Sequence, residues 1–269
     1  MTSHRWTATI CALAISSTPG PPSLSAGRQD KPGAVDRALT PEPAQILAAA
    51  ADAIQRIRSA SYDASFEAVF PQSTVFTMRG VVDLERGDSS QPALPGRVHI
   101  KSDGTGGAQE VSFDGSVARR LVRDKKLLTE GRVDKGAIGV VVNSSALVLL
   151  AWDMLWAEPL KYERAAAAST YLGLGLADGV MCHVIDLQYQ VPGTDVQGAR
   201  WWFSVKDDLP RRFQKVLHTA AGPMIQELRI SNLRLGNGIA PSDFRIDLPE
   251  GYSYQPFVPG EKLKAIPVG

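Results

Sequence analysis

The stretch SYDASFEAVF, residues 61–70, decides the fold, because polar and apolar side chains alternate along it. Its apolar positions are Tyr62, Ala64, Phe66, Ala68 and Phe70. Successive side chains of an extended strand point to opposite faces, so the alternation predicts a strand with one buried face. The next segment, TVFTMRGVVDLERGD at 74–88, repeats the pattern with Met78 on its apolar side. Together the two segments predict the start of an antiparallel sheet.

Further short strands follow, separated by turns that contain Gly or Asp. They are RVHIKSDG (97–104), AQEVSFDGSVARRLV (108–122), KKLLTEGRVD (125–134), STYLGLGLADGVMCHVIDLQYQV (169–191), ARWWFSVKDDLPRRFQKVLHT (199–219), GPMIQELRISNLRLG (222–236) and FRIDLPEGYSY (244–254). KDDLP and TAAGP within this series are typical of hairpin turns. We therefore predict a mainly β domain of the α+β class, with roughly ten short strands in an antiparallel meander.

Two helices are predicted to pack against this sheet. In AQILAAAADAIQRIRSA, residues 44–60, apolar residues recur at three- and four-residue spacing and form one stripe. NSSALVLLAWDMLWAEP, residues 143–159, is almost entirely apolar and is expected to form one short helix. A helix that is apolar nearly all round is either an ordinary core helix or a lid over an apolar cavity.

Composition and charge exclude several classes of partner. The chain has 29 Lys and Arg against 28 Asp and Glu, so its formal charge of +1 gives no field that would attract nucleic acid. No segment approaches the ~20 apolar residues of a membrane helix. Residues 1–26 combine an early basic pair, an apolar run and small residues, which predicts a signal peptide and export. We expect a disordered linker at 27–40, one domain at 41–256 and a Pro-containing tail at 257–269.

Several of these segments also carry a family resemblance. Their order resembles that of the LolA/LolB-like lipoprotein carriers of the periplasm, and among them a predicted periplasmic domain family. The matching segments are SASYDASFEAVF, MRGVVDLERG, VSFDGSVARRLV, GVMCHVIDL and WWFSVKDDLPRRF followed by FRIDLPEGYSY. The resemblance covers residues 41–256 and implies a half-open, strongly curved antiparallel sheet with helices on its concave side. It also implies a periplasmic location and an apolar cavity.

The implied ligand is a lipid or a lipoprotein acyl chain, bound without a cofactor. The residues expected to line the cavity are Phe66, Met78, Val148, Leu149, Trp152, Leu155, Trp156, His183, Trp201 and Phe203. An envelope protein is a further expected partner, and nucleic acid is not. The resemblance does not separate carriage of the ligand from sensing it.

Motifs for covalent or metal chemistry are missing from the sequence. It contains no G-x-S-x-G, H-x-H, H-E-x-x-H or C-x-x-C. Cys182 and His183 are neighbours on an expected strand, so their side chains point to opposite faces and cannot act on one atom. We therefore predict a protein that is not an enzyme, in which Cys182 is small apolar filler and His183 a wall residue.

Three functional hypotheses follow from the sequence. The first is a periplasmic protein that binds an apolar ligand without covalent catalysis. The second is a structural or interaction module of the cell envelope whose core is filled by its own side chains. The third is a redox partner that uses the thiol of Cys182, because an exported free thiol meets oxidising conditions.

Overall fold

The computed structural model describes residues 41–71, 74–87, 95–133, 144–151, 158–189, 196–219, 221–236 and 238–257. Its elements in chain order are α1 (Pro43–Arg56), β1 (Ser59–Val69), β2 (Val75–Arg86), β3 (Pro95–Gly104), β4 (Gln109–Phe113), β5 (Val117–Val122), β6 (Leu127–Arg132), η1 (Ser145–Leu149), α3 (Lys161–Arg164), β7 (Ala168–Ala177), β8 (Val180–Gln188), β9 (Val196–Ser204), β10 (Pro210–Thr219), β11 (Gly222–Leu235), η3 (Pro241–Phe244) and β12 (Ser253–Pro256).

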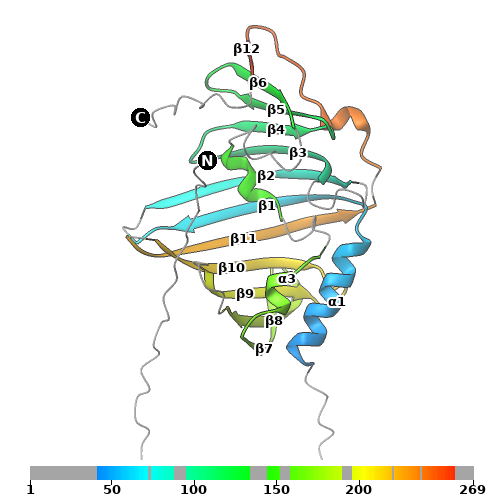
Figure 1. Ribbon diagram of the computed structural model, residues 1–269, viewed down its shortest axis with the longest axis vertical. Coiled ribbons are helices and arrows are strands. Elements are labelled where there is room, and N and C mark those ends of the chain that lie inside the picture. The colour runs from blue at the N-terminus through cyan, green and yellow to red at the C-terminus, as the bar shows by residue number, and fades with distance from the viewer. Residues whose placement is uncertain are drawn as a thin grey trace, which may run out of the picture.

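The described strands form one open sheet in the order β12-β6-β5-β4-β3-β2-β1-β11-β10-β9-β8-β7. Figure 1 shows them stacked from β12 at the top to β7 at the bottom, so the two edge strands lie at opposite ends. All neighbouring strands are antiparallel except β12 and β6, which are parallel. The predicted mainly β, largely antiparallel sheet is confirmed, whereas the predicted number of roughly ten strands was too low, because the sheet has twelve.

One face of the sheet carries α1 and η1, and we call it the inner face. It holds the apolar side of β1, where Tyr62, Ala64 and Phe66 are buried. These side chains join one large core together with the buried stripe of α1 and with Leu149 of η1. The predicted alternation is thereby confirmed from Tyr62 to Ala68, and so is the predicted stripe of the first helix. Phe70 was wrongly placed on the buried side, because β1 ends at Val69 and Phe70 is 37% exposed. The other face of the sheet, which we call the outer face, is mostly polar around β1, β2 and β11.

Arg86 at the end of β2 fixes the end of α1. Its guanidinium donates hydrogen bonds to the carbonyl oxygens of Ile57, at 2.9 Å, and Ile54, at 2.8 Å. The last carbonyls of a helix have no partner within the helix, and a cation favours this end of the helix dipole. A strand residue therefore caps the helix and ties it to the central part of the sheet.

The predicted central helix over residues 143–159 is wrong in the part that the structure describes. The chain makes a 3₁₀ helix only over Ser145–Leu149, and Leu150 returns to an extended conformation. The Tyr62 hydroxyl donates to the carbonyl oxygen of Leu149 at 3.3 Å and accepts a hydrogen bond from the Ala151 amide at 3.1 Å. These bonds to the sheet replace the bonds that would continue a helix, so tertiary contacts override the local propensity.

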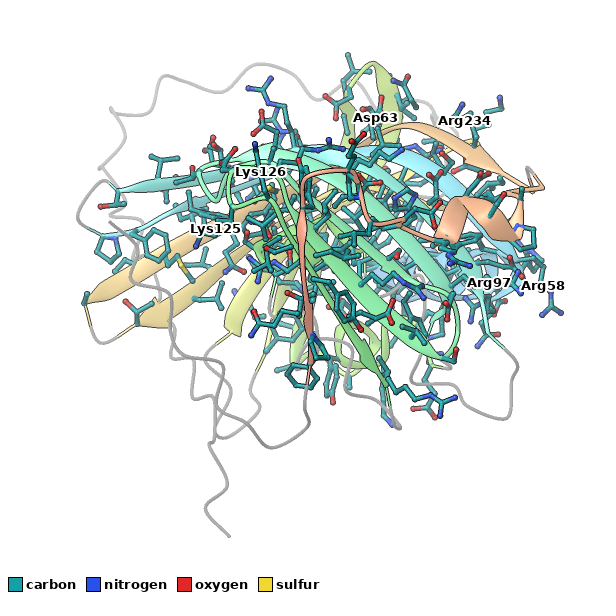
Figure 2. The ribbon with its side chains drawn as sticks, turned by 90° about the horizontal axis from the view of Figure 1, so that it is seen from above. Arg58, Asp63, Arg97, Lys125, Lys126 and Arg234 are labelled. Carbon is teal, nitrogen blue, oxygen red and sulfur yellow. The ribbon has the colours of Figure 1, made fainter. Side chains whose placement is uncertain are left out.

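The predicted closing strand over residues 244–254 is also wrong. Phe244 ends η3, and Ile246 packs on the outer face against Leu121 and Leu128. The alternation of apolar residues therefore reflects an extended segment that crosses the sheet, not a strand paired in it. Pairing begins only at Ser253, where β12 joins β6. Figure 2 shows β12 running past the neighbouring strands at this end of the molecule.

Candidate functional site

An aromatic cluster forms the centre of the inner face over β9 and β10. The ring of Trp201 stacks on that of Phe203 with centroids 5.6 Å apart, and the ring of Phe213 lies 4.8 Å from Trp201. Trp201 and Phe213 are directly opposite each other in the register of β9 and β10. Cross-strand aromatic pairs of this kind stabilise a sheet and leave a flat apolar surface.

Five of the seven described residues that were predicted to line a cavity meet in the core of the inner face. They are Phe66, Met78, Leu149, Trp201 and Phe203, and all are buried there. Val148 and His183 are half-buried. Trp152, Leu155 and Trp156 lie outside the described residues. The structure therefore places the described members of the predicted set on one face of the sheet.

His183 contacts a tyrosine instead of an apolar side chain. Its Nδ1 atom lies 3.1 Å from the hydroxyl of Tyr171 on β7. The two rings are 5.8 Å apart and tilted. His183 is thus a hydrogen-bonded residue of the sheet wall.

The inner face is less tightly covered at positions on β2, β11 and β10, which lie around β1 in the sheet. Phe76, Phe213 and Met224 are half-buried, although each packs against the core. Tyr189, just after β8, and Val148 of η1 are half-buried against the same core. We call these five residues the half-buried apolar band. Each has apolar surface that a ligand could cover without displacing the deepest core residues.

A polar group lies inside this apolar region. Lys215 of β10 places its ammonium 4.9 Å from the centre of the Phe213 ring and 5.3 Å from that of Trp201. The same ammonium lies 3.8 Å from Oε1 of Glu163 on α3, and the Tyr189 hydroxyl donates to that oxygen at 3.1 Å. The Glu163 side chain is only 4% exposed. Lys215 is 24% exposed, so it is chiefly the Glu163 carboxylate that is removed from water and that requires a hydrogen-bond partner for each oxygen.

Sequence analysis missed this polar group, although one signal was present. In RFQKVLHT, Lys215 lies two residues from both Phe213 and Leu217, so the three side chains share one face of a strand. The sequence therefore places a lysine on an apolar strand face. Glu163 could not have been found in this way, because α3 is a single turn. Its contact with Lys215 depends on how the chain folds back over β10.

Cys182 lies on the outer face in a small separate cluster with Ala177, Val184 and Trp202. Its thiol is fully buried and lies 3.4 Å from the carbonyl oxygen of Val180. Burial raises the pKa of this thiol to about 11, so little reactive thiolate is present near neutral pH. The predicted separation of Cys182 from His183 onto opposite faces is confirmed.

Two hollows formed by described residues are lined mainly by polar side chains. One, of about 320 Å³, includes Glu67, Arg79 and Glu227. The other, of about 450 Å³, includes Asp83 and His99. Both sets belong to the outer face, so neither hollow is the apolar cavity that the family resemblance implies.

A charged network borders the larger hollow. Glu110 is bonded to His99 at 2.9 Å and to Arg123 at 2.9 Å, and the His99 hydrogen bond holds the pKa of Glu110 below its usual value. Figure 2 marks two further charged residues, Asp63 and Arg234, that belong to the outer face of β1 and β11. Because the charges of both signs are interleaved, the network fits a solvated sheet face better than a site for one kind of ion.

The edge strand β7 carries a second uncovered apolar surface. Leu172, Leu174 and Leu176 are 47%, 60% and 63% exposed, and Met181 opposite Leu176 is 47% exposed. The strand has ten residues and none is charged. Natural edge strands are usually protected by charges, Pro or short length, so an uncharged edge of this length is typical of a surface that pairs or packs with something else.

Comparisons with known proteins concern the fold. No protein-family model and no curated protein sequence matches the chain. Solved structures that it resembles include a LolA superfamily protein from Nitrosomonas europaea, with a TM-score of 0.33 and 10% identity over 75% of this chain and 95% of that one. The Mycobacterium tuberculosis lipoprotein LppX has a TM-score of 0.43 and 10% identity over 71% of this chain and 94% of that one.

A third similar structure is Pseudomonas aeruginosa MucB in its complex with MucA. It has a TM-score of 0.41 and 16% identity over 76% of this chain, and this chain spans 61% of that one. The superfamily expected from the sequence is thus present among the similar structures.

Among the described residues, no helix is long and apolar enough to cross a membrane. The same residues contain no group of three or more His, Cys, Asp or Glu side chains that could hold a metal ion. The inner face offers apolar contact through the half-buried apolar band, and hydrogen bonding and charge through the Lys215–Glu163 pair.

Proposed function

We propose that the chain is an exported protein that binds an apolar ligand, a lipid or an acyl chain, on the inner face of its sheet, without covalent catalysis. The observation that carries this proposal is the half-buried apolar band around the Trp201 cluster. Apolar surface that is left partly in water gains about 25 cal/mol per Å² when a ligand covers it. A flexible chain that packs on several such side chains therefore gains binding energy without any polar contact.

The short η1 element supports this proposal through Val148. Side-chain hydrogen bonds hold the element at both ends, with Gln109 at its start and Tyr62 at its end. Val148 is half-buried and packs against the core, so it offers apolar surface that a ligand could cover without movement of the chain.

The test uses full-length protein that has been delipidated and N-phenyl-1-naphthylamine, a neutral apolar fluorescent probe. We expect saturable binding by the wild type. Phe213→Ser together with Met224→Ser should weaken it roughly thirtyfold, since each change removes apolar contact worth about 1 kcal/mol. The control is Leu248→Ser, which removes an exposed apolar side chain that is not part of the inner-face core. Absence of saturable binding by the wild type would overturn the proposal.

A second function, protein–protein interaction through β7, is favoured by the uncharged edge strand. Peptide strands add to exposed sheet edges through main-chain hydrogen bonds. Leu174→Lys and Leu176→Lys place charges on that edge and should abolish association with a partner. If the wild type does not associate with any protein in envelope extracts, the interaction function fails.

A further inference from the structure

The Glu163 carboxylate beside Lys215 is incompletely satisfied. Within the described residues, Oε2 of Glu163 is buried and has no hydrogen-bond partner, while Oε1 accepts from Tyr189. The Lys215 ammonium lies 3.8 Å from Glu163 and over two aromatic rings, a separation too long for a hydrogen bond, and its side chain is 24% exposed. Trp201 Nε1 is a second buried polar atom without a partner among these residues. Buried polar groups are nearly always paired, so two unpaired ones on side chains next to Lys215 indicate a missing partner.

The hydrogen-bonding capacities of these atoms define the partner. Glu163 Oε2 is an acceptor and requires a donor. Lys215 Nζ and Trp201 Nε1 are donors and require acceptors. A hydroxyl group both donates and accepts, so it can satisfy the carboxylate and the ammonium together.

The charges of the pair restrict the partner further. Lys215 and Glu163 carry opposite charges, so the group is neutral before anything binds. A ligand carboxylate near Lys215 would also approach the carboxylate of Glu163, which is 4% exposed and poorly screened. A ligand amine near Glu163 would likewise approach the ammonium of Lys215. A neutral headgroup avoids both repulsions.

The position of the pair connects it to the apolar ligand. Lys215 stands on the inner face next to Phe213, and Tyr189 belongs both to the half-buried apolar band and to the polar group. A polar head held there would place its attached chain against that band. Sites for amphiphiles combine apolar walls with a few polar groups that fix orientation.

We propose that Glu163 and Lys215 bind the hydroxyl-bearing headgroup of a neutral amphiphile, of the monoacylglycerol type, and thereby fix the orientation of its acyl chain. This inference rests on the proposed function, because it assigns the polar end of the ligand whose apolar end lies on the half-buried apolar band. It names the ligand class as a neutral hydroxylated lipid in preference to a fatty acid or a fatty amine.

The experiment measures displacement of N-phenyl-1-naphthylamine from full-length protein by 1-monooleoylglycerol, oleate and oleylamine, which share one chain and differ in headgroup. We expect monooleoylglycerol to bind about tenfold more tightly than the other two, the effect of one charge-assisted hydrogen bond. Glu163→Gln should weaken monooleoylglycerol binding and strengthen oleate binding, because Lys215 then lacks its counter-charge. Lys215→Met keeps the aliphatic stem on the aromatic rings and should strengthen oleylamine binding instead.

Controls separate the outcomes. Glu158→Gln removes an exposed carboxylate that pairs with Lys161 and should change none of the three affinities. Direct probe binding and the melting temperature show that each variant is folded with its apolar site intact. If the probe does not bind to the wild type, the proposed function itself fails. If the probe binds but the three headgroups compete equally, water alone satisfies the buried atoms and the headgroup assignment is wrong.

Discussion

Replacing Tyr62 by Phe tests whether one hydroxyl holds η1 on the inner face. The Tyr62 side chain is fully buried, and burial raises the pKa of its hydroxyl, so it remains a neutral donor and acceptor at all physiological pH values. It donates to the carbonyl oxygen of Leu149 and accepts from the amide of Ala151. Phenylalanine fills nearly the same space but leaves both backbone groups without this partner.

The expected loss follows from those two groups. A buried backbone donor or acceptor that loses its partner costs about 1–3 kcal/mol, so we expect Tyr62→Phe to lower the free energy of unfolding by roughly 2–3 kcal/mol. For a domain of this size the melting temperature should fall by about 5–10 °C. Because η1 also loosens, N-phenyl-1-naphthylamine should enter the variant faster than the wild type.

Urea unfolding followed by tryptophan fluorescence measures the first effect, and stopped-flow mixing with the probe measures the second. Tyr171→Phe is the matched control, because within the described part of the chain its half-buried hydroxyl bonds only to the His183 ring, and it should cost less than about 1 kcal/mol. A Tyr62→Phe variant within about 0.5 kcal/mol of the wild type, with unchanged probe entry, would refute the role assigned to the hydroxyl.

Three further predictions concern other parts of the molecule. Cys182→Ser should leave probe binding intact. The wild-type thiol should react with Ellman's reagent at pH 8 only after unfolding, because burial raises the pKa of the thiol to about 11. Fast reaction of the folded protein would revive the redox hypothesis. Arg86→Met should lower the free energy of unfolding by about 1–3 kcal/mol in urea, since two carbonyls at the end of α1 lose their donor. The control is the surface variant Arg97→Met. Equal losses of stability in the two variants would contradict the capping role of Arg86. Glu110 has a folded pKa below its unfolded value, so its stabilising effect is present above the unfolded pKa of about 4.3 and is lost as pH falls through the folded pKa. The stability gap between wild type and Glu110→Gln should therefore narrow as the pH is lowered from 6 toward 3, and a constant gap would show that the bond to His99 does not shift the carboxylate.

Period-two alternation was sufficient to predict the strands of the central sheet and the face on which their side chains lie. It placed Tyr62 and Phe66 on the buried side, and it separated Cys182 from His183 correctly. Alternation reports which side of an extended chain is covered, and it holds whether or not the chain is paired with another strand. For that reason it failed at Phe244 and Ile246, where an extended segment crosses the outer face without pairing.

Features that depend on distant contacts could not be predicted. The apolar run at 143–159 has a strong helical pattern, but two bonds to Tyr62 end the helix at Leu149. The Glu163–Lys215 contact joins a single turn of helix to a strand more than fifty residues later, and no sequence pattern connects the two. Local propensity describes a segment alone, whereas these features are decided by what the segment meets.

The pairing of β1 with β11 has a consequence for how the protein reaches its folded state. Asn232 bonds to Asp63 across this pair, although the two residues are 169 positions apart in the sequence. On either side of this pair, neighbouring strands are mostly joined by short hairpins, so each half of the sheet can form locally. The pairing of β1 with β11 requires a very large loop of chain to close first. High contact order of this kind slows folding. Because synthesis proceeds from the N-terminus, β1 cannot pair with β11 until β11 has been made, so one edge of β1 stays unpaired until then.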